Sequence, residues 1–202
     1  MDINTSNKFN FENITLDKPT KIDDLYISNL NVIVQTCKLT ILKINNNKLV
    51  LSISEKMEKL LNSFDETIIS LISENSEDFF EDKLSIEDTE ELYKNSYKNH
   101  KKETKMTINM SDKLNIFNKH KEILTVDSLS SGDNIICLLK CSKIVYYKAH
   151  CIPYWEVIQI KIKEEPVVLN TNCYLFVEDK DDTYIEKDKS LESSLKMLKI
   201  KS

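Results

Sequence analysis

The sequence predicts an α+β protein in which an antiparallel sheet or small barrel carries an inserted pair of helices. Short runs rich in β-branched residues occur before residue 55 and again after residue 105. Between these runs, apolar residues recur at steps of three and four, which is the period of an amphipathic helix. The order of strands, helices and strands favours a single domain over residues 25–177.

The N-terminal part predicts an arm followed by a hairpin. Residues 1–24 are polar and rich in Asn, without sustained periodicity, so we expect a flexible N-terminal arm. From Ile27, the run ISNLNVIVQTCKLTILKI predicts one or two strands. Residues 45–47 are all Asn and predict a turn, because Asn tolerates positive φ, and residues 48–54 complete the hairpin.

Two amphipathic helices are expected next. The first has Ser54 as its N-cap, and its apolar face consists of Met57, Leu60, Leu61, Phe64, Ile68, Leu71 and Ile72. The second begins at Ser85, where Ser85 and Asp88 are placed as a capping box with Asp in place of Glu. The opposite face of both helices is acidic, which is typical of a solvated surface.

The rest of the chain predicts several strands and a tail. Alternation over residues 155–162 places Ile158, Ile160 and Ile162 on one face, and Trp155 and Lys161 on the other. Residues 167–177 predict one more strand or strand pair, and residues 178–202 an acidic C-terminal tail. An open five-stranded barrel of the OB type and a flat sheet backed by helices fit this pattern about equally well.

Composition limits the classes of function. The chain has five Cys and no Arg, so we expect reduced thiols and cationic contacts made by Lys alone. The N-terminus lacks a signal-peptide pattern and no stretch is apolar enough to span a membrane, so we expect a soluble intracellular protein without a membrane partner. Residues 51–100 carry 13 acidic residues and 5 Lys, whereas residues 101–163 carry 11 Lys and 6 acidic residues. This polarised charge indicates a basic region that faces a polyanion, although the formal net charge is -5.

The basic region interleaves aromatic residues with lysines, the combination that stacks bases and neutralises phosphates. The predicted nucleic-acid-binding residues are Lys105, Lys140, Lys143, Tyr146, Tyr147, Lys148, Tyr154, Trp155, Lys161 and Lys163. Tyr146 and Tyr147 are adjacent in a strand, so at least one of them is expected to point outward. The alternative is that the aromatic residues pack in the core and the lysines form a solvated sheet edge. Tyr154 and Phe117 are the next candidates for a stacking platform.

Metal binding and catalysis receive little support. Cys137 and Cys141 are four residues apart on an apolar strand, where buried free thiols usually occur. His150 and Cys151 are adjacent and would diverge, so we expect no metal site. The chain has one Gly, and therefore neither a phosphate-binding loop nor a nucleophile elbow. We expect a protein that is not an enzyme and has no cofactor.

Four blocks occur in a characteristic order: IVQTCKLTI, KLVLSIS, NSEDFFEDKLSIEDTEELYKNSYK and SSGDNIICLLKCSKIVYYKAHCIPYWEVIQIKI. Over residues 30–163, this chain resembles a group of single-stranded-DNA-binding proteins of large nucleocytoplasmic DNA viruses. The resemblance implies an OB-type core and single-stranded DNA as the partner. It also implies a role in viral-type DNA replication or recombination in the host cytoplasm.

The last block carries most of the resemblance. The positions that match the family pattern are Cys141, Ser142, Ile144, Tyr146, Lys148, Trp155, Gln159 and Lys161. Three positions depart from it, because Lys143 stands where Gly is usual, Val145 where Trp is usual, and Glu156 where Lys is usual. We expect the loss of one aromatic residue and one cation to affect the affinity for DNA more than the fold.

Two functions stay open. One is sequence-tolerant binding of single-stranded DNA, and the other is a virion structural or assembly-scaffold protein that uses the same sheet for protein contacts. A groove shared by the lysines with Tyr146, Tyr147 and Trp155 favours DNA, whereas buried and dispersed aromatic residues favour the scaffold. The acidic tail either competes with DNA and recruits replication proteins or only aids solubility. The oligomeric state, a homo-oligomer included, stays open too.

Overall fold

The computed structural model describes residues 3–5, 8–100, 103–148 and 150–163. The chain divides into residues 1–165 and 166–202, and all described residues belong to the first of these units. The strand expected at residues 167–177 and the acidic tail expected at residues 178–202 lie outside the described residues.

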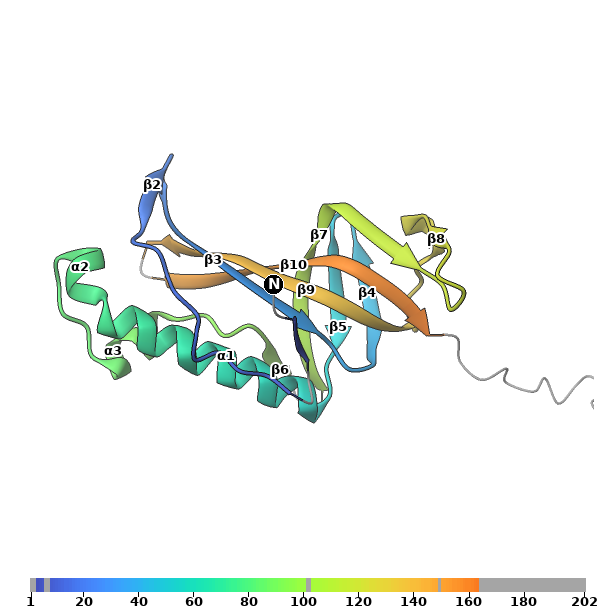
Figure 1. The fold of residues 1–202 in the computed structure, drawn as a ribbon, viewed down its shortest axis with the longest axis horizontal. Helices are drawn as coiled ribbons and strands as arrows, with labels where there is room; N and C mark the ends of the chain where they lie inside the picture. Colours follow the sequence, from blue (N-terminus) through green and yellow to red (C-terminus); the bar gives the residue numbers. More distant parts are fainter. Residues whose placement is uncertain (1–2, 6–7, 101–102, 149, 164–202) are drawn as a thin grey trace, which may run out of the picture. The chain divides into compact units, whose positions relative to one another are not determined.

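Ten strands of the described ranges form one sheet (Figure 1). The three longest are β7, with 15 residues, and the neighbouring strands β9 and β10, with 14 residues each. The strands are β1 (Ile3–Thr5), β2 (Thr20–Ile22), β3 (Leu25–Gln35), β4 (Leu39–Asn45), β5 (Lys48–Ser52), β6 (Lys98–His100), β7 (Glu103–Phe117), β8 (Ile123–Leu124), β9 (Asn134–Tyr147) and β10 (His150–Lys163).

The main path of the sheet runs β1–β3–β9–β10–β7–β5–β4. Strand β4 also pairs with β9, through Leu39 with Ile135 and Thr40 with Asn134. Strands β9, β10, β7, β5 and β4 therefore curl into a ring that these two residue pairs join. The prediction of an antiparallel sheet is wrong in part, because β7 pairs with β10 in parallel and β1 pairs with β3 in parallel. Parallel pairing is possible because the chain makes a long excursion through β8 and β9 between β7 and β10.

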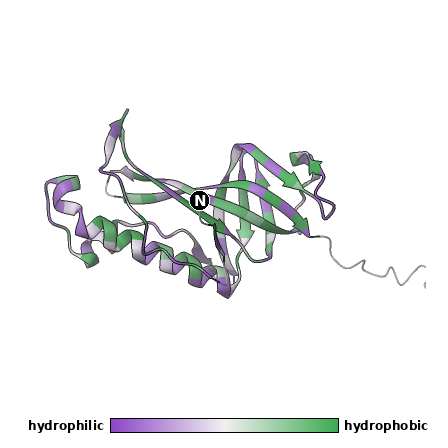
Figure 2. Cartoon of the chain, viewed as in Figure 1, coloured by the Kyte–Doolittle hydropathy of each residue, from purple (hydrophilic) through white to green (hydrophobic). Residues whose placement is uncertain are grey.

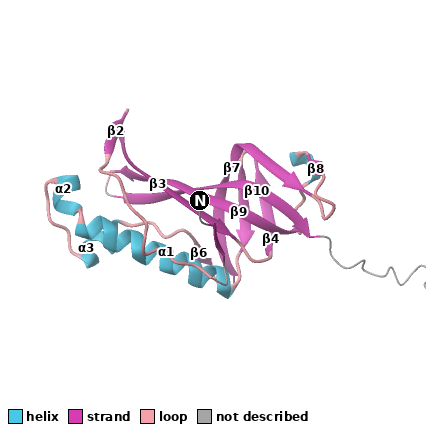
Figure 3. Cartoon of the chain, in the orientation of Figure 1, coloured by secondary structure: helices cyan, strands magenta, loops and turns pink. Residues whose placement is uncertain are grey.

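Three helices of the described chain lie between β5 and β6 and form one group (Figure 3). They are α1 (Glu55–Glu74), α2 (Ser76–Phe80) and α3 (Ile86–Leu92). The expected pair corresponds to α1 and α3, and the short α2 is an addition. The capping box of Ser85 and Asp88 is confirmed, since both of its reciprocal hydrogen bonds are formed. No described helix has the length and apolar character needed to cross a membrane.

Helix α1 supplies one side of the core. The residues expected on its apolar face are buried, except that Leu71 is half-buried. The ring of Phe64 packs 4.8 Å from the ring of Trp155 on β10, measured between centroids. Figure 2 shows polar and apolar positions mixed along α1 and the long strands, as expected of elements that bury one face.

The N-terminal segment differs from the flexible arm that its composition predicts. Strand β1 pairs with residues 33–35 of β3, and β2 pairs with residues 25–27 of the same strand. Phe11 is only 3% exposed, and its ring contacts Phe64 edge-on at 5.6 Å. Burial of this ring anchors the described part of the segment to the sheet and to α1, which the polar composition around it concealed.

A β-bulge overturns the alternation expected for residues 155–162. Between Val157 and Gln159 the register of β10 against β9 shifts, so one extra residue enters the strand. Trp155, Val157 and Ile160 are therefore buried on one face, and Gln159 and Lys161 are exposed on the other. Lys161 does not share a face with Trp155.

Candidate nucleic-acid interface

Strands β9 and β10 form a long hairpin with two different faces. Successive residues point to opposite sides, and the buried positions mark the side that packs against the core. The opposite side, called here the outer face, carries Ile136, Leu138, Lys140, Lys143, Val145, Tyr147, Ile152, Tyr154, Glu156, Gln159, Lys161 and Lys163. Most of the predicted lysines therefore lie on one surface.

Trp155 is not on that surface. Its side chain is 4% exposed, and its indole Nε1 donates a hydrogen bond of 2.8 Å to Oγ of Ser96. With its ring against Phe64 and its only polar atom bonded inside the protein, this Trp has no face left for a base. The prediction that Trp155 stacks on nucleic acid is wrong, because packing against Phe64 of α1 and the hydrogen bond to Ser96 hold the indole inside the protein.

A buried carboxylate holds the partner of Trp155 in place. Asp65 of α1 accepts hydrogen bonds from Oγ of Ser96 at 2.6 Å, from its backbone N at 2.9 Å, and from the Tyr93 hydroxyl at 2.9 Å. Burial raises the pKa of Asp65 to about 6, although these hydrogen bonds act in the opposite direction. Sequence reasoning missed this network, since a single Asp between apolar helix positions resembles part of a solvated helix face.

Tyr146 is also directed inward. Ser28 Oγ donates a 3.2 Å hydrogen bond to its hydroxyl, and its ring packs edge-on against Phe80 at 5.4 Å. Burial raises the pKa of this phenol. The prediction that Tyr146 belongs to the interface is therefore wrong, whereas its neighbour Tyr147 is 42% exposed, as alternation along the strand requires.

Two tyrosines of the outer face are paired with lysines. The Lys143 ammonium lies over the ring of Tyr154, 4.5 Å from its centroid, and these residues are register partners across the hairpin. The Lys148 ammonium lies over the ring of Tyr147 at 5.1 Å. Each pair places a ring and a positive charge side by side. A base that stacks on the ring where the ammonium lies would displace it, and the ammonium is then close enough to contact the phosphate.

The remaining predicted lysines divide into two groups. Lys140 lies opposite Glu156, and Lys161 and Lys163 lie on the same outer face toward the end of β10. Lys105 is elsewhere, on the part of β7 that pairs with β5 and β6, and its ammonium forms an ion pair of 3.0 Å with Glu103. The structure brings Lys105 together with none of the hairpin lysines.

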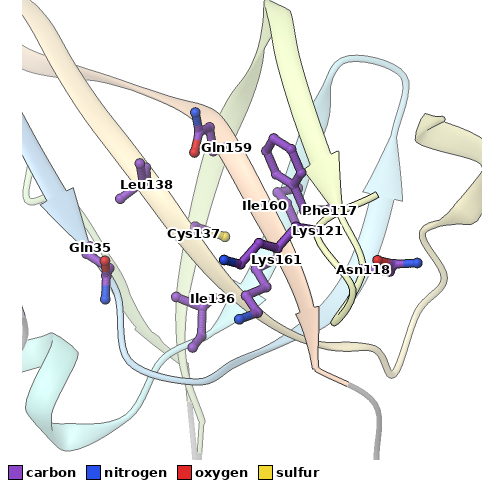
Figure 4. Close-up of a pocket in the computed structure, with 10 residues that line it drawn as sticks. All are labelled: Gln35, Phe117, Asn118, Lys121, Ile136, Cys137, Leu138, Gln159, Ile160 and Lys161. Carbon is purple, nitrogen blue, oxygen red and sulfur yellow. The ribbon is translucent and has the colours of Figure 1, made fainter. Parts of the chain in front are cut away.

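A pocket lies on the outer face where the hairpin meets the end of β7 (Figure 4). Its cavity has a volume of about 450 Å³. We call it the Phe117 pocket, and its lining consists of Gln35, Phe117, Asn118, Lys121, Ile136, Cys137, Leu138, Gln159, Ile160 and Lys161. The sequence indicated Phe117 and Lys161 as binding candidates and Gln159 as a match to the family pattern. Gln35 and Lys121 come from segments far apart in the chain and carry no motif.

The cysteines of the hairpin are buried on the core face. Burial raises the pKa of the Cys137 and Cys141 thiols, and that of Cys151 to about 11, so the thiolate needed for a metal bond is disfavoured. His150 is exposed on the other side of the strand from Cys151. Among the described residues, no group of three or more His, Cys, Asp or Glu side chains is placed to hold a metal ion.

Comparison with known proteins gives a family and distant structural neighbours. A model of a family of unknown function (DUF5871) matches residues 37–178, which is more than half of the chain. No curated protein matches the sequence. The single-stranded DNA-binding protein from bacteriophage Enc34, solved in complex with ssDNA, is 8% identical with a TM-score of 0.43, over 75% of this chain and 97% of that chain. Gp2.5, a single-stranded DNA-binding protein encoded by bacteriophage T7, is 12% identical with a TM-score of 0.44, over 71% of this chain and 98% of that chain.

Proposed function

The chain belongs to the DUF5871 family, whose function is unknown, and we propose that it is a non-enzymatic, sequence-tolerant single-stranded-DNA-binding protein. The observation that carries the proposal is the outer face, where Tyr147 and Tyr154 each have a lysine ammonium over the ring. Its role would lie in viral-type DNA replication or recombination inside the cell, in the host cytoplasm if the protein is viral. Residues 178–202 would recruit replication proteins.

The outer face is long enough for several nucleotides. Strands β9 and β10 have 14 residues each, which corresponds to roughly 45 Å at about 3.3 Å per residue. Lys163 and Lys161 lie toward one end, Lys140 near the middle, Lys143 between the middle and the turn, and Lys148 at the turn. A strand laid along this surface would meet cations throughout and aromatic faces at intervals.

The chemistry of the cations fits sequence tolerance. Lysine is a point charge on a flexible stem and lacks the planar fork with which Arg recognises a guanine edge. Contacts of this kind position a phosphate backbone without reading the sequence. Stacking on a tyrosine is equally tolerant, because every base has a π-face.

The strand order supports an OB-type assignment for the domain. The ring β4–β5–β7–β10–β9 has a single parallel pair, β7 with β10, and the remaining pairs are antiparallel. We interpret it as a partly open five-stranded barrel, in which β9 and β10 extend beyond the ring to form the platform.

The scaffold function remains the second candidate because of a specific observation. Trp155 and Tyr146, two of the three aromatic residues whose position was to decide between the functions, are buried. On the outer face the half-buried Val145 also lies opposite the exposed Ile152, and this apolar pair would suit a protein contact. Tyr147 and Tyr154, each under a lysine, favour DNA over this alternative.

Titration of a fluorescent oligo-dT at two salt concentrations tests the proposal. Binding is expected to weaken as salt rises, with a logarithmic slope of about −0.7 for each phosphate contacted. Lys143→Gln should weaken binding and reduce the slope by about that amount, because it removes one cation from the outer face. Lys105→Gln is the matched control and should change neither quantity. Absence of binding at low salt, or equal effects of the two variants, would contradict the proposal.

A further inference from the structure

The floor of the Phe117 pocket is a row of side chains across three strands. Gln35 of β3 is the register partner of Leu138 on β9, and Leu138 is the register partner of Gln159 on β10. Because neighbouring strands lie about 4.8 Å apart, the two glutamines stand roughly 10 Å apart with the apolar Leu138 between them. This row is a flat apolar patch with a hydrogen-bonding amide at each end.

An aromatic wall and two cations adjoin this floor. Phe117 at the end of β7 is the register partner of Lys161, which in turn pairs with Ile136. Figure 4 shows Lys121, from the loop after β7, reaching over the same part of the pocket as Lys161. A ring, an apolar floor and two ammonium groups thus surround one cavity of about 450 Å³, which is within the usual range for a small ligand.

The side-chain amide of Asn118 fixes the conformation of the loop that carries Lys121. Asn118 Oδ1 accepts hydrogen bonds from the backbone N of His120 at 2.9 Å and of Glu122 at 3.0 Å, and its Nδ2 donates to Glu122 Oε2 at 2.6 Å. Asn118 is therefore used to shape the loop. In contrast, no hydrogen bond to a described residue is found for the side-chain amides of Gln35 and Gln159, which are both exposed at the pocket.

We propose that the Phe117 pocket holds one nucleotide of the bound strand and distinguishes its base. The base lies on Leu138 beside Phe117, Gln159 hydrogen-bonds its edge, and Lys121 and Lys161 hold the phosphate. The inference rests on the proposed function and limits its sequence tolerance at one nucleotide, because an amide offers a donor and an acceptor side by side that can match a base edge. The lysines and tyrosines elsewhere on the outer face are assigned to phosphates and to stacking.

Affinities of the full-length protein for dA, dC and dT homopolymers of equal length test the inference. The wild type is expected to show a spread of about tenfold between the best and the worst of the three, as one well-placed amide contact allows. Gln159→Leu should remove most of the spread while still binding all three. Asn115→Leu is the matched control, since Asn115 is the register partner of Gln159 on β7 but lies outside the pocket lining, and it should keep the spread.

The other outcomes are distinguishable. Two outcomes overturn the inference and leave the proposed function intact. In the first, the wild type binds the three homopolymers with equal affinity. In the second, the spread of affinities persists in Gln159→Leu, because it comes from self-stacking of the dA strand. Absence of binding to all three strands overturns the proposed function itself. The second arm measures binding of free dAMP, dCMP and TMP. If one of them binds, and Gln159→Leu abolishes this binding but leaves binding of the homopolymers unchanged, the pocket serves a free nucleotide. The inference about the bound strand is then overturned.

Discussion

On the core face of the β9–β10 hairpin, Trp155 and Tyr146 each combine a ring contact with an internal hydrogen bond. On the outer face, Tyr147 and Tyr154 are covered only in part, and a lysine ammonium lies over each ring. The four residues come from the same two strands, and in each strand the inward and outward residues are immediate neighbours. The comparison teaches that the partners of an aromatic residue, and not its place in a basic run, decide whether it stabilises the fold or meets a ligand.

The largest expected effect is on the core face. Trp155→Ala should lower the free energy of unfolding by about 3–5 kcal/mol, because it leaves a large cavity beside Phe64. Urea unfolding followed by circular dichroism measures this change. Tyr154→Ala, one residue away on the outer face, should cost less than about 1 kcal/mol. A stable Trp155→Ala protein that has lost only DNA binding would reverse the assignment of the two faces.

The pH dependence of stability tests the carboxylate that supports the core face. Burial raises the pKa of Asp65 to about 6, so between about pH 4 and pH 6 the folded state binds a proton that the unfolded state has released. The contribution of Asp65 to the free energy of unfolding is therefore fully present below about pH 4. About 2–3 kcal/mol of it is lost as pH rises through about 6.

The control for this prediction is Asp65→Asn, compared with the wild type at each pH by urea unfolding. The variant is expected to be less stable than the wild type at every pH tested. Its side-chain NH2 group is a donor and lies opposite another donor, such as the Ser96 backbone N, so a hydrogen bond is lost. The difference between the two proteins should shrink as pH rises from 4 to 6.5. A constant difference would show that the carboxyl group does not titrate in this range.

The outer face is expected to act on binding rather than stability. Tyr154→Ala and Tyr147→Ala should each weaken oligo-dT binding by about 1–3 kcal/mol, the usual contribution of one stacked base. Tyr146→Ala is the matched variant on the core face, and it should lower the melting temperature because it leaves Ser28 and Phe80 without their contact. Fluorescence anisotropy and thermal unfolding of all three variants provide the comparison. Equal losses of affinity in all three would mean that folding, and not stacking, controls binding.

Local pattern predicted the main elements of the fold. The period of α1, the capping box at Ser85 and the opposite directions of Tyr146 and Tyr147 follow from spacing alone, and all agree with the structure. The bulge after Val157 could not be predicted, because an added residue leaves no mark on composition yet exchanges the two faces for the rest of the strand.

The site was harder to predict than the fold. The lysines of the hairpin were found because they are close in sequence, whereas the Phe117 pocket needs side chains from β3, β7, β9 and β10. Such a set depends on the strand order, and above all on the parallel pairing of β7 with β10. A sequence that predicts only antiparallel neighbours does not place Phe117 beside Lys161.

The smallest expected effect is on the fluorescence of the single Trp. Because Trp155 is buried and bonded to Ser96, its emission should resist quenching by iodide and change little when oligo-dT binds. The double variant Tyr154→Trp with Trp155→Phe moves the indole by one residue onto the outer face, under the Lys143 ammonium. Oligo-dT should then quench the emission, since a base stacked on the indole is an effective quencher. Strong quenching in the wild type and none in the double variant would show that DNA binds on the opposite side of the hairpin from the one proposed.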